Sequence, residues 1–273
     1  MPKTQLLETG GTTQKYYKSI NNTYLDVYKK YLMLHYPFFR APNETLEERQ
    51  INLTDHCISR VGEIEGKNIL EVGCGNGTQS LYILHNHKPK YLTGIDINKD
   101  NIEAAKSQNG HANVSFFVDD AQKLENIPDN SVDVLICIES AFHYPDKQKF
   151  LEQIERVLTS DGKFLIADIL SKSKKNRYFF EKWKRKMSFH HTTADHYSDL
   201  FKNSNLQVEH EENLTPSIKQ GYKGYNKWIQ RKSFKNFFKY LWFKLFLFVQ
   251  VNLNILLLRT RRNYVLFIGK PRQ

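Results

Sequence analysis

The segment EVGCGNG, residues 71–77, combines one acid with three glycines spaced two residues apart. Glycine leaves the backbone bare, so a ligand can approach a loop of this kind closely. An apolar strand precedes the loop, and a helix that follows it would add the positive end of its dipole. The pattern predicts a loop that binds the polar head of a ligand, formed by Glu71, Gly73, Cys74, Gly75 and Gly77.

A second acid, Asp96 in GIDIN, ends the next predicted strand about twenty residues later, where dinucleotide folds bind ribose hydroxyls. Two ligands therefore compete: a nicotinamide dinucleotide and another adenosine cofactor. The dinucleotide fingerprint G-x-G-x-x-G needs a glycine where this chain has Thr78. Glu71 would also repel a pyrophosphate, but it would attract a head group that carries ammonium and sulfonium charges. The loop favours the cation-bearing ligand.

The elements that must hold this loop alternate between short apolar strands and helices of about ten residues. We expect strands at 68–72, 91–96, 114–118, 132–138 and, after the turn TSDGK, 163–169. We expect helices at 46–61, with Asn43 as its cap, and at 77–87, 99–108 and 146–158. Such alternation indicates an α/β fold with a parallel, doubly wound sheet. The remainder is expected to be mainly helical at 171–205 and 216–262, with strands at 206–212 and 263–269 and a strand left open at 249–255.

Positive charge and aromatic rings are concentrated in the last third of the chain. Residues 171–273 contain 22 Lys or Arg against 6 Asp or Glu, and 20 of the 36 aromatic residues. This combination suits an anionic membrane surface, a nucleic acid or an amphiphilic substrate. The three cysteines lack metal-binding spacing, so we expect reduced thiols and no structural metal. We expect a cytoplasmic protein because no secretory signal is visible.

Four segments in register, EVGCGNG, GIDIN, VDDAQKL and VDVLICIESAFHYPD, resemble the class I, Rossmann-like S-adenosylmethionine-dependent methyltransferases. The resemblance extends from Thr45 to Leu170 and includes the last strand. It implies a seven-stranded, mostly parallel sheet with an antiparallel last strand, and S-adenosyl-L-methionine as the cofactor. The similar branch comprises O-methyltransferases of small molecules, lipids and natural products.

The same resemblance implies roles for the acids and their neighbours. Glu71 and the loop 73–77 would hold the methionine portion of the cofactor, Asp96 would accept from both ribose hydroxyls, and Ile97 would pack on the adenine. Asp120 would accept from the adenine amino group beside the amide of Ala121.

The alternative for the acids of this second loop is purely structural. Asp119 or Asp120 could simply cap the loop, and we prefer that interpretation for Asp119.

His143 lies just past the predicted fourth strand, at the edge of an open α/β sheet where ligands bind. With a reference pKa of about 6.5, an imidazole there could remove the proton of a hydroxyl acceptor. Asp168, at the end of the fifth strand, could fix the imidazole tautomer. The pair resembles the His and Asp of sugar and natural-product O-methyltransferases, and Phe142 would contact the acceptor. In the alternative, His143 only packs near the pocket.

The acceptor class can be narrowed from the residues around this histidine. Enzymes that methylate base amines of nucleic acids carry (Asp/Asn)-Pro-Pro-aromatic where this chain reads ESAF, and the Pro-Cys pair of pyrimidine-carbon methyltransferases does not occur. We therefore expect no nucleic-acid partner and a hydrophobic small-molecule or lipid acceptor that is methylated at a hydroxyl. Carbon methylation of a quinone, tocopherol or sterol-like substrate and a non-catalytic cofactor-binding protein remain open.

The two ends of the chain are expected to form a lid. We divide the chain into a helical N-terminal lid (1–42), in which Tyr17 is a candidate gate, a cofactor-binding domain (43–213), a basic aromatic cap insertion (214–262) and a closing strand (263–273).

The apolar segment 241–258 is nearly long enough to span a bilayer. A span would separate the strand 263–269 from its sheet, so an element that lies on a surface or lines the pocket fits better. Its basic flanks could meet anionic headgroups, or they could form a solvated face over an ordinary cap: Lys235, Lys239, Arg259, Arg261 and Arg262.

Overall fold

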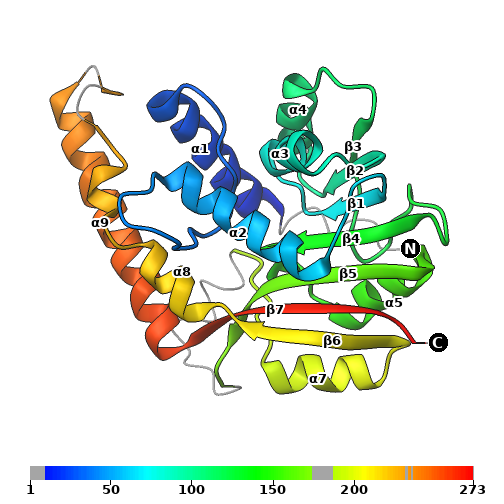
Figure 1. The fold of residues 1–273 in the computed structure, drawn as a ribbon. Coiled ribbons are helices and arrows are strands. Elements are labelled where there is room, and N and C mark those ends of the chain that lie inside the picture. The colour runs from blue at the N-terminus through cyan, green and yellow to red at the C-terminus, as the bar shows by residue number, and fades with distance from the viewer. Residues whose placement is uncertain (1–9, 174–186, 231–232, 235, 273) are drawn as a thin grey trace.

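A seven-stranded sheet with the order β3-β2-β1-β4-β5-β7-β6 forms the centre of the protein (Figure 1). The structure is a computed structural model that describes residues 10–173, 187–230, 233–234 and 236–272. The strands β1 to β5 run parallel to one another, whereas β7 is antiparallel to its two neighbours, β5 and β6. The predicted α/β fold and the antiparallel last strand are therefore confirmed. The strands are β1 Asn68–Val72, β2 Tyr91–Asp96, β3 Val114–Val118, β4 Val132–Ile138, β5 Leu158–Ser171, β6 Leu206–Asn213 and β7 Arg262–Pro271.

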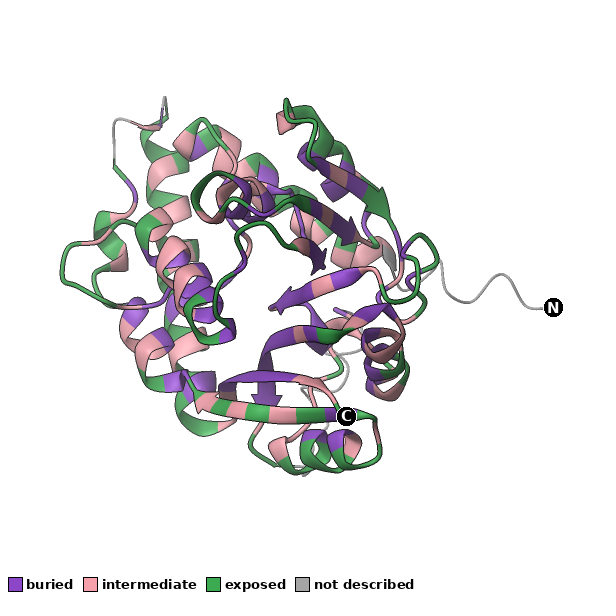
Figure 2. Cartoon of the chain, turned by 45° about the vertical axis from the view of Figure 1, so that its right-hand side comes forward, coloured by how far each residue is buried: buried purple, intermediate pink, exposed green. Residues whose placement is uncertain are grey.

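Helices cover both faces of the sheet, which explains why the central strands are apolar on both sides. One face packs against α2 (Leu46–Val61), α3 (Thr78–His87), α4 (Lys99–Gln108), α8 (Thr215–Gly221) and α9 (Phe237–Thr260). The other packs against α5 (Lys147–Val157) and α7 (Ala194–Lys202). Neighbouring residues in a strand serve opposite faces, as Ile69 and Leu70 do. Only the edge strand β6 alternates between half-buried and exposed positions along most of its length (Figure 2).

The N-terminal helix α1 (Gly10–Tyr28) lies beside α2 and α4 on the helix-rich side of the molecule (Figure 1). Short 3-10 turns η1 (Ala141–His143) and η2 (Tyr225–Lys227) follow β4 and α8. A small apolar cluster joins Val27 of α1 to Ile229 and Phe234, which precede α9. The two ends of the chain therefore pack against each other, as the lid prediction requires.

Several local predictions were wrong. Asn43 does not cap α2: Thr45 does, in a capping box with Glu48 in which each side chain bonds the other residue's backbone amide. The sequence text T-x-x-E carried this signal. The turn at 159–163 is part of a longer β5 that begins at Leu158, and 249–255 is helical within α9. Within 171–205 the described helix is α7, and 174–186 lies outside the described residues.

The closing strand β7 returns to the sheet directly after α9. The helix ends at Thr260, and β7 begins at Arg262. Its two partners, β5 and β6, both precede α9 in the chain. Because β7 lies between β5 and β6, the sheet can be continuous only if both ends of α9 are on the same side of any membrane.

We expect Gly269→Ala in β7 to lower the free energy of unfolding by about 1–3 kcal/mol, the range typical of overpacking. A Cβ at this position would collide with the carbonyl oxygen of Gln207 in β6 and with the ring of Phe164 in β5. Denaturant unfolding measures the change. Gly110→Ala is the control, because a Cβ there meets nothing within 4 Å. Equal stability of the two variants would contradict this account of β7.

Candidate active site

The glycine loop after β1 is shaped by backbone conformation and close packing. Gly73, Gly75 and Gly77 have φ values of 75°, 56° and 80°, the left-handed region that favours glycine. A Cβ at Gly73 would collide with Ser140, and one at Gly77 with Ala105 of α4. The loop therefore tolerates no side chain at these positions and leads directly into α3.

Four amides of this loop already have acceptors within the protein, contrary to the simplest expectation. The amides of Gly73 and Cys74 donate to the carbonyl of Ile95 at 2.8 and 2.9 Å, and that of Gly77 donates to the carbonyl of Cys74. The amide of Gly75 donates to Oδ2 of Asp96 at 3.0 Å. The backbone bonds instead fix the loop to the end of β2, which brings Asp96 against the glycines.

Glu71 and Asp96 place two acids beside the loop without a basic partner. Glu71 is 3% exposed and accepts a hydrogen bond from the hydroxyl of Ser80. Burial raises its pKa to about 8, and the nearby charge of Asp96 adds to the effect. Burial also raises the pKa of Asp96, although the amide of Asn98 and the side chain of Asn101 stabilise its charged form. Within the described residues, no Lys, Arg or His forms an ion pair with either acid.

The residues around these acids fit a ligand that brings positive charge, polar groups and an apolar face. A cation would offset the desolvation that both acids undergo. Two polar atoms nearby in the chain, Oγ1 of Thr78 and Nδ2 of Asn98, are buried without a hydrogen-bond partner. Ile97, next to Asp96, is 65% exposed although it is apolar. This donor set is compatible with an adenosyl sulfonium ligand, as the sequence predicted.

Asp119 and Asp120 follow β3 at the same edge of the sheet. Asp119 accepts from the amides of Asp120, Glu125 and Asn126, so it caps the loop as we preferred. Asp120 also caps locally, because its Oδ1 accepts from the amide and side chain of Gln122. The adenine contact of Asp120 and of its buried neighbour Ala121 remains a prediction.

Helix α1 is tied to the glycine loop by a chain of buried amides. Nδ2 of Asn76, within the loop, donates to Oδ1 of Asn21 on α1 and to the carbonyl of Leu32. Nδ2 of Asn21 donates to Oδ1 of Asn101 on α4, and Nδ2 of Asn101 donates to Asp96. The sequence analysis singled out none of these asparagines, because their contacts join segments distant in the chain.

His143 has a defined tautomer. Its Nδ1 lies 3.1 Å from the carbonyl oxygen of Ser188, which can only accept, so Nδ1 carries the proton. Nε2 is therefore the acceptor for the hydroxyl of Tyr17 at 2.9 Å. Burial lowers the pKa of His143 to about 4, with further lowering by His190 and Lys147. The imidazole is thus neutral at physiological pH, and its basic nitrogen faces the lid helix.

Asp168 does not support His143, so its predicted role as the residue that fixes the tautomer is wrong. Its carboxylate is fully buried and accepts from the hydroxyl of Tyr197 at 2.9 Å and the amide of Ile169 at 2.8 Å. It therefore links β5 to α7. The carbonyl of Ser188, not Asp168, accepts the hydrogen bond from Nδ1 of His143. A backbone group of this kind leaves no signal in a sequence motif.

Aromatic side chains surround the histidine. Phe142 packs on His143 with ring centroids 4.3 Å apart and also contacts Phe189 and His191. Phe142 is buried, so it forms the wall behind the imidazole. The predicted acceptor contact of Phe142 stays a prediction.

Glu139, at the end of β4, is a candidate residue that the sequence analysis used only to exclude other enzymes. It adopts a left-handed φ of 53°, and its Oε1 accepts from the amide of Tyr36 at 2.6 Å. Burial raises its pKa to about 8. Tyr36 contacts the rings of Tyr222 and Tyr264 and donates from its hydroxyl to Asn254 of α9. A lone acid directly after an apolar strand was the available signal.

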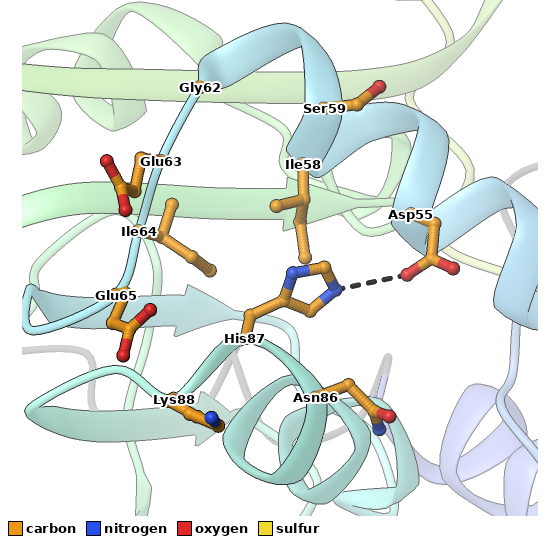
Figure 3. Close-up of a pocket in the computed structure, with 10 residues that line it drawn as sticks. All are labelled: Asp55, Ile58, Ser59, Gly62, Glu63, Ile64, Glu65, Asn86, His87 and Lys88. Atoms are coloured by element: carbon orange, nitrogen blue, oxygen red, sulfur yellow. Dashed lines mark hydrogen bonds and ion pairs between the residues drawn. The ribbon is translucent and has the colours of Figure 1, made fainter.

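A separate hollow of about 490 Å³ lies far from these residues, at the amino end of β1 (Figure 3). It is bounded by the ends of α2 and α3, and an ion pair of 3.0 Å joins His87 to Asp55 there. None of the predicted site residues lines it. Because the hollow lies at the opposite edge of the sheet from the glycine loop, we assign it no role in the reaction.

The carboxyl ends of β1, β2 and β4 thus bring together the glycine loop, two acids and a neutral histidine, which contacts Tyr17 of α1. A family model described as "Methyltransferase domain" matches residues 64–232, more than half of the chain. The chain belongs to this methyltransferase family. The sequence-based resemblance to S-adenosylmethionine-dependent methyltransferases is confirmed.

Curated relatives of this methyltransferase are named for the acceptors that they methylate. A fatty-acid O-methyltransferase of Mycolicibacterium smegmatis is 34% identical over 133 residues, which are 49% of this chain and 46% of the relative. A phthiotriol/phenolphthiotriol dimycocerosates methyltransferase of Mycobacterium tuberculosis is 35% identical over 121 residues, 44% and 43% of the two chains. The matched region thus spans slightly less than half the length of these relatives.

The fold of this methyltransferase also matches solved structures along nearly its full length. A cyclopropane synthase from Mycobacterium tuberculosis superposes with a TM-score of 0.75 at 14% identity, covering 98% of this chain and all of the other. At this identity the likeness concerns the fold alone.

We expect Glu139→Gln to flatten the pH dependence of stability. The pKa of Glu139 is raised in the folded state, so its contribution to the free energy of unfolding is complete below the unfolded pKa and is lost as pH rises toward 8. Between about pH 5 and about pH 8 the wild-type chain should therefore lose more stability than the variant, as measured by denaturant unfolding without ligand.

The exposed acid on α4 provides the control for this experiment. Glu103→Gln should leave the slope of the wild-type profile in place, because its side chain is 62% exposed. Parallel profiles of wild type and Glu139→Gln would contradict a proton held by Glu139.

Proposed function

We propose that this chain transfers the methyl group of S-adenosylmethionine to a hydroxyl of an apolar, lipid-like or natural-product acceptor. The observation that carries the proposal is the neutral His143, whose Nε2 is an acceptor at the carboxyl edge of the sheet. The names of the relatives, which include fatty-acid and phthiotriol methyltransferases, favour an apolar acceptor. The aromatic wall of Phe142 and Phe189 supports the same class.

The cofactor, when bound, supplies an electrophilic methyl group on a sulfonium centre. Glu71 and Asp96 would balance its positive charge, which favours their ionised forms despite burial. Asp96 would also accept from ribose hydroxyls, and the exposed Ile97 would cover one face of the adenine. The asparagine chain through Asn21 would then hold α1 over the bound molecule.

His143 would act as the general base for the acceptor. As the acceptor oxygen bonds to the methyl carbon and the carbon–sulfur bond breaks, leaving a neutral thioether, the hydroxyl proton would pass to Nε2, while Nδ1 keeps its own proton in the hydrogen bond to the carbonyl of Ser188. The hydroxyl of Tyr17 now occupies Nε2, so the acceptor must displace it. Tyr17 therefore keeps water away from Nε2 until an acceptor binds. The hydrogen bond between its hydroxyl and Nε2 gives the predicted gate a specific contact.

Orientation supplies much of the remaining rate. In-line displacement needs little covalent chemistry from the protein, and correct alignment is worth about 7–11 kcal/mol. The wall of Phe142, fixed against His143, would hold an apolar acceptor and exclude water. Mass spectrometry of the product identifies the methylated atom: an O-methyl product supports this proposal, and a C-methyl product would replace it.

Asp96→Ala should weaken the binding of S-adenosylmethionine about tenfold or more, because hydrogen bonds to a charged group contribute about 1.5–3 kcal/mol. Isothermal titration calorimetry measures this, with circular dichroism to confirm the fold. Asp100→Ala is the control, since the side chain of this acid of α4 is 41% exposed and pairs with Lys18. Unchanged affinity in Asp96→Ala would refute the cofactor assignment.

His143→Ala should lower turnover of a long-chain alcohol or phenol by roughly 10²–10⁴ while cofactor affinity is retained, because only general-base assistance is lost. Turnover is followed as transfer of the labelled methyl group. His111→Ala, at a histidine that contacts only His85 among the described residues outside its own loop, should keep full activity. Full activity in His143→Ala would remove the base, and preference for a fatty acid, whose carboxylate needs no base, would point to an ester product.

A further inference from the structure

Helix α9 carries a long apolar stripe that faces away from the protein. The helix has 24 residues, and six exposed large side chains are spaced three, four or seven positions apart, which places them on one side of the helix. Four further exposed side chains, Phe237, Phe246, Phe248 and Leu253, flank this side. Phe238 is 77% exposed and Trp242 is 74% exposed. The stripe is defined by Phe238, Leu241, Trp242, Leu245, Val249 and Leu256, and this set is called the α9 stripe below.

The opposite side of α9 already has its partners. Val251 and Leu258 are buried in the main core, and Tyr240 and Phe243 pack on the cluster around Phe234. Asn254 accepts from the hydroxyl of Tyr36. The α9 stripe is therefore not core exposed by a loose helix: α9 is anchored on one side and apolar on the other. The helix lies at the edge of the molecule (Figure 1).

Length and composition would allow α9 to cross a bilayer, but the sheet does not. Among the described residues, α9 is the one helix that is long and apolar enough to do so. Because β7 begins at Arg262 and lies between β5 and β6, a crossing would place β7 on the other side from both partners. The helix can meet a bilayer only along its side, with its axis near the plane of the surface.

Charge selects the bilayer over a second copy of this chain. Helix α9 contains no acid, and its basic residues include Lys239, Lys244 and Arg259. Lys172 adds a further cation at the end of the helix, where it donates to the carbonyls of Leu258 and Arg259. Two copies packed through this face would bring these cations together, in a chain whose net charge is +11. Anionic headgroups would neutralise them.

The surface next to the α9 stripe has a hollow that could accommodate the acyl chains of lipids. A hollow of about 690 Å³ lies between η2 and the first turns of α9, with Tyr225 on one side and Leu241, Trp242 and Leu245 on the other. Trp and Tyr are the residues that settle at the interface between headgroups and hydrocarbon. The nitrogen of Lys244 lies 5.3 Å from the centre of the Tyr240 ring, so its charge would lie close to the interface between headgroups and hydrocarbon.

We infer that α9 docks the protein on the surface of an anionic lipid bilayer, with the α9 stripe among the acyl chains and the cations among the headgroups. This docking is a property of the surface, and it does not depend on which acceptor is methylated or on methyl transfer itself.

Co-sedimentation of the full chain with vesicles tests the inference. Vesicles with roughly 30% phosphatidylglycerol in phosphatidylcholine should bind the protein, and binding should weaken at about 1 M salt, where charge is screened. Trp242→Ser/Leu245→Ser should lower the partition coefficient tenfold or more, because the burial of two large side chains is lost. Tyr91→Ser, at an exposed ring at the start of β2, should bind like wild type.

Three outcomes would overturn the inference. They are no binding of wild type to these vesicles at low salt, equal binding of wild type and the α9 variant, or a dimer in sedimentation velocity that Trp242→Ser/Leu245→Ser abolishes. Circular dichroism shows that the variant is folded. Cofactor binding is measured on the same samples, so a failed docking test leaves the proposed methyl transfer untouched.

Discussion

The carboxylate of Asp96 is the point on which the site depends. It accepts from the amide of Gly75, from Asn98 at the start of α4 and from Asn101, which passes the connection to Asn21 on α1. A half-buried acid with these donors holds the glycine loop, the end of β2 and α1 in one arrangement. Hydrogen bonds stabilise its charge but do not neutralise it, so a cationic ligand is needed to balance this charge.

The second half of the site is organised by backbone groups. The carbonyl of Ser188 sets the tautomer of His143, and the hydroxyl of Tyr17 covers the nitrogen that remains. These contacts come from segments before and after the first four parallel strands, so His143 is held by parts of the chain that are far apart in the sequence. Glu139 extends this arrangement toward Tyr36 and Asn254, which connects the site to the inner side of α9.

The sheet could be predicted from the sequence almost residue by residue, because apolar runs such as 68–72 and 132–138 are buried on both faces and have few alternatives. The glycine loop followed from its spacing. The role of Asp168 could not be predicted, because its partner Tyr197 and the competing carbonyl of Ser188 lie in a segment without a recognisable pattern. Asn21 and Asn101 were missed for a related reason: an asparagine in a helix carries no signal of a contact 80 residues away.

The insertion of β7 between two earlier strands has a consequence for biosynthesis. Until residues 262–271 leave the ribosome, β5 and β6 each have an edge without a partner strand. The apolar helix α9 then has no following strand to attach its end to the sheet. Open edges and apolar helices are the features that nascent chains use to aggregate. The interval before β7 emerges is therefore when the chain is most prone to aggregate, and a bilayer or a chaperone would shelter its apolar surfaces during that interval.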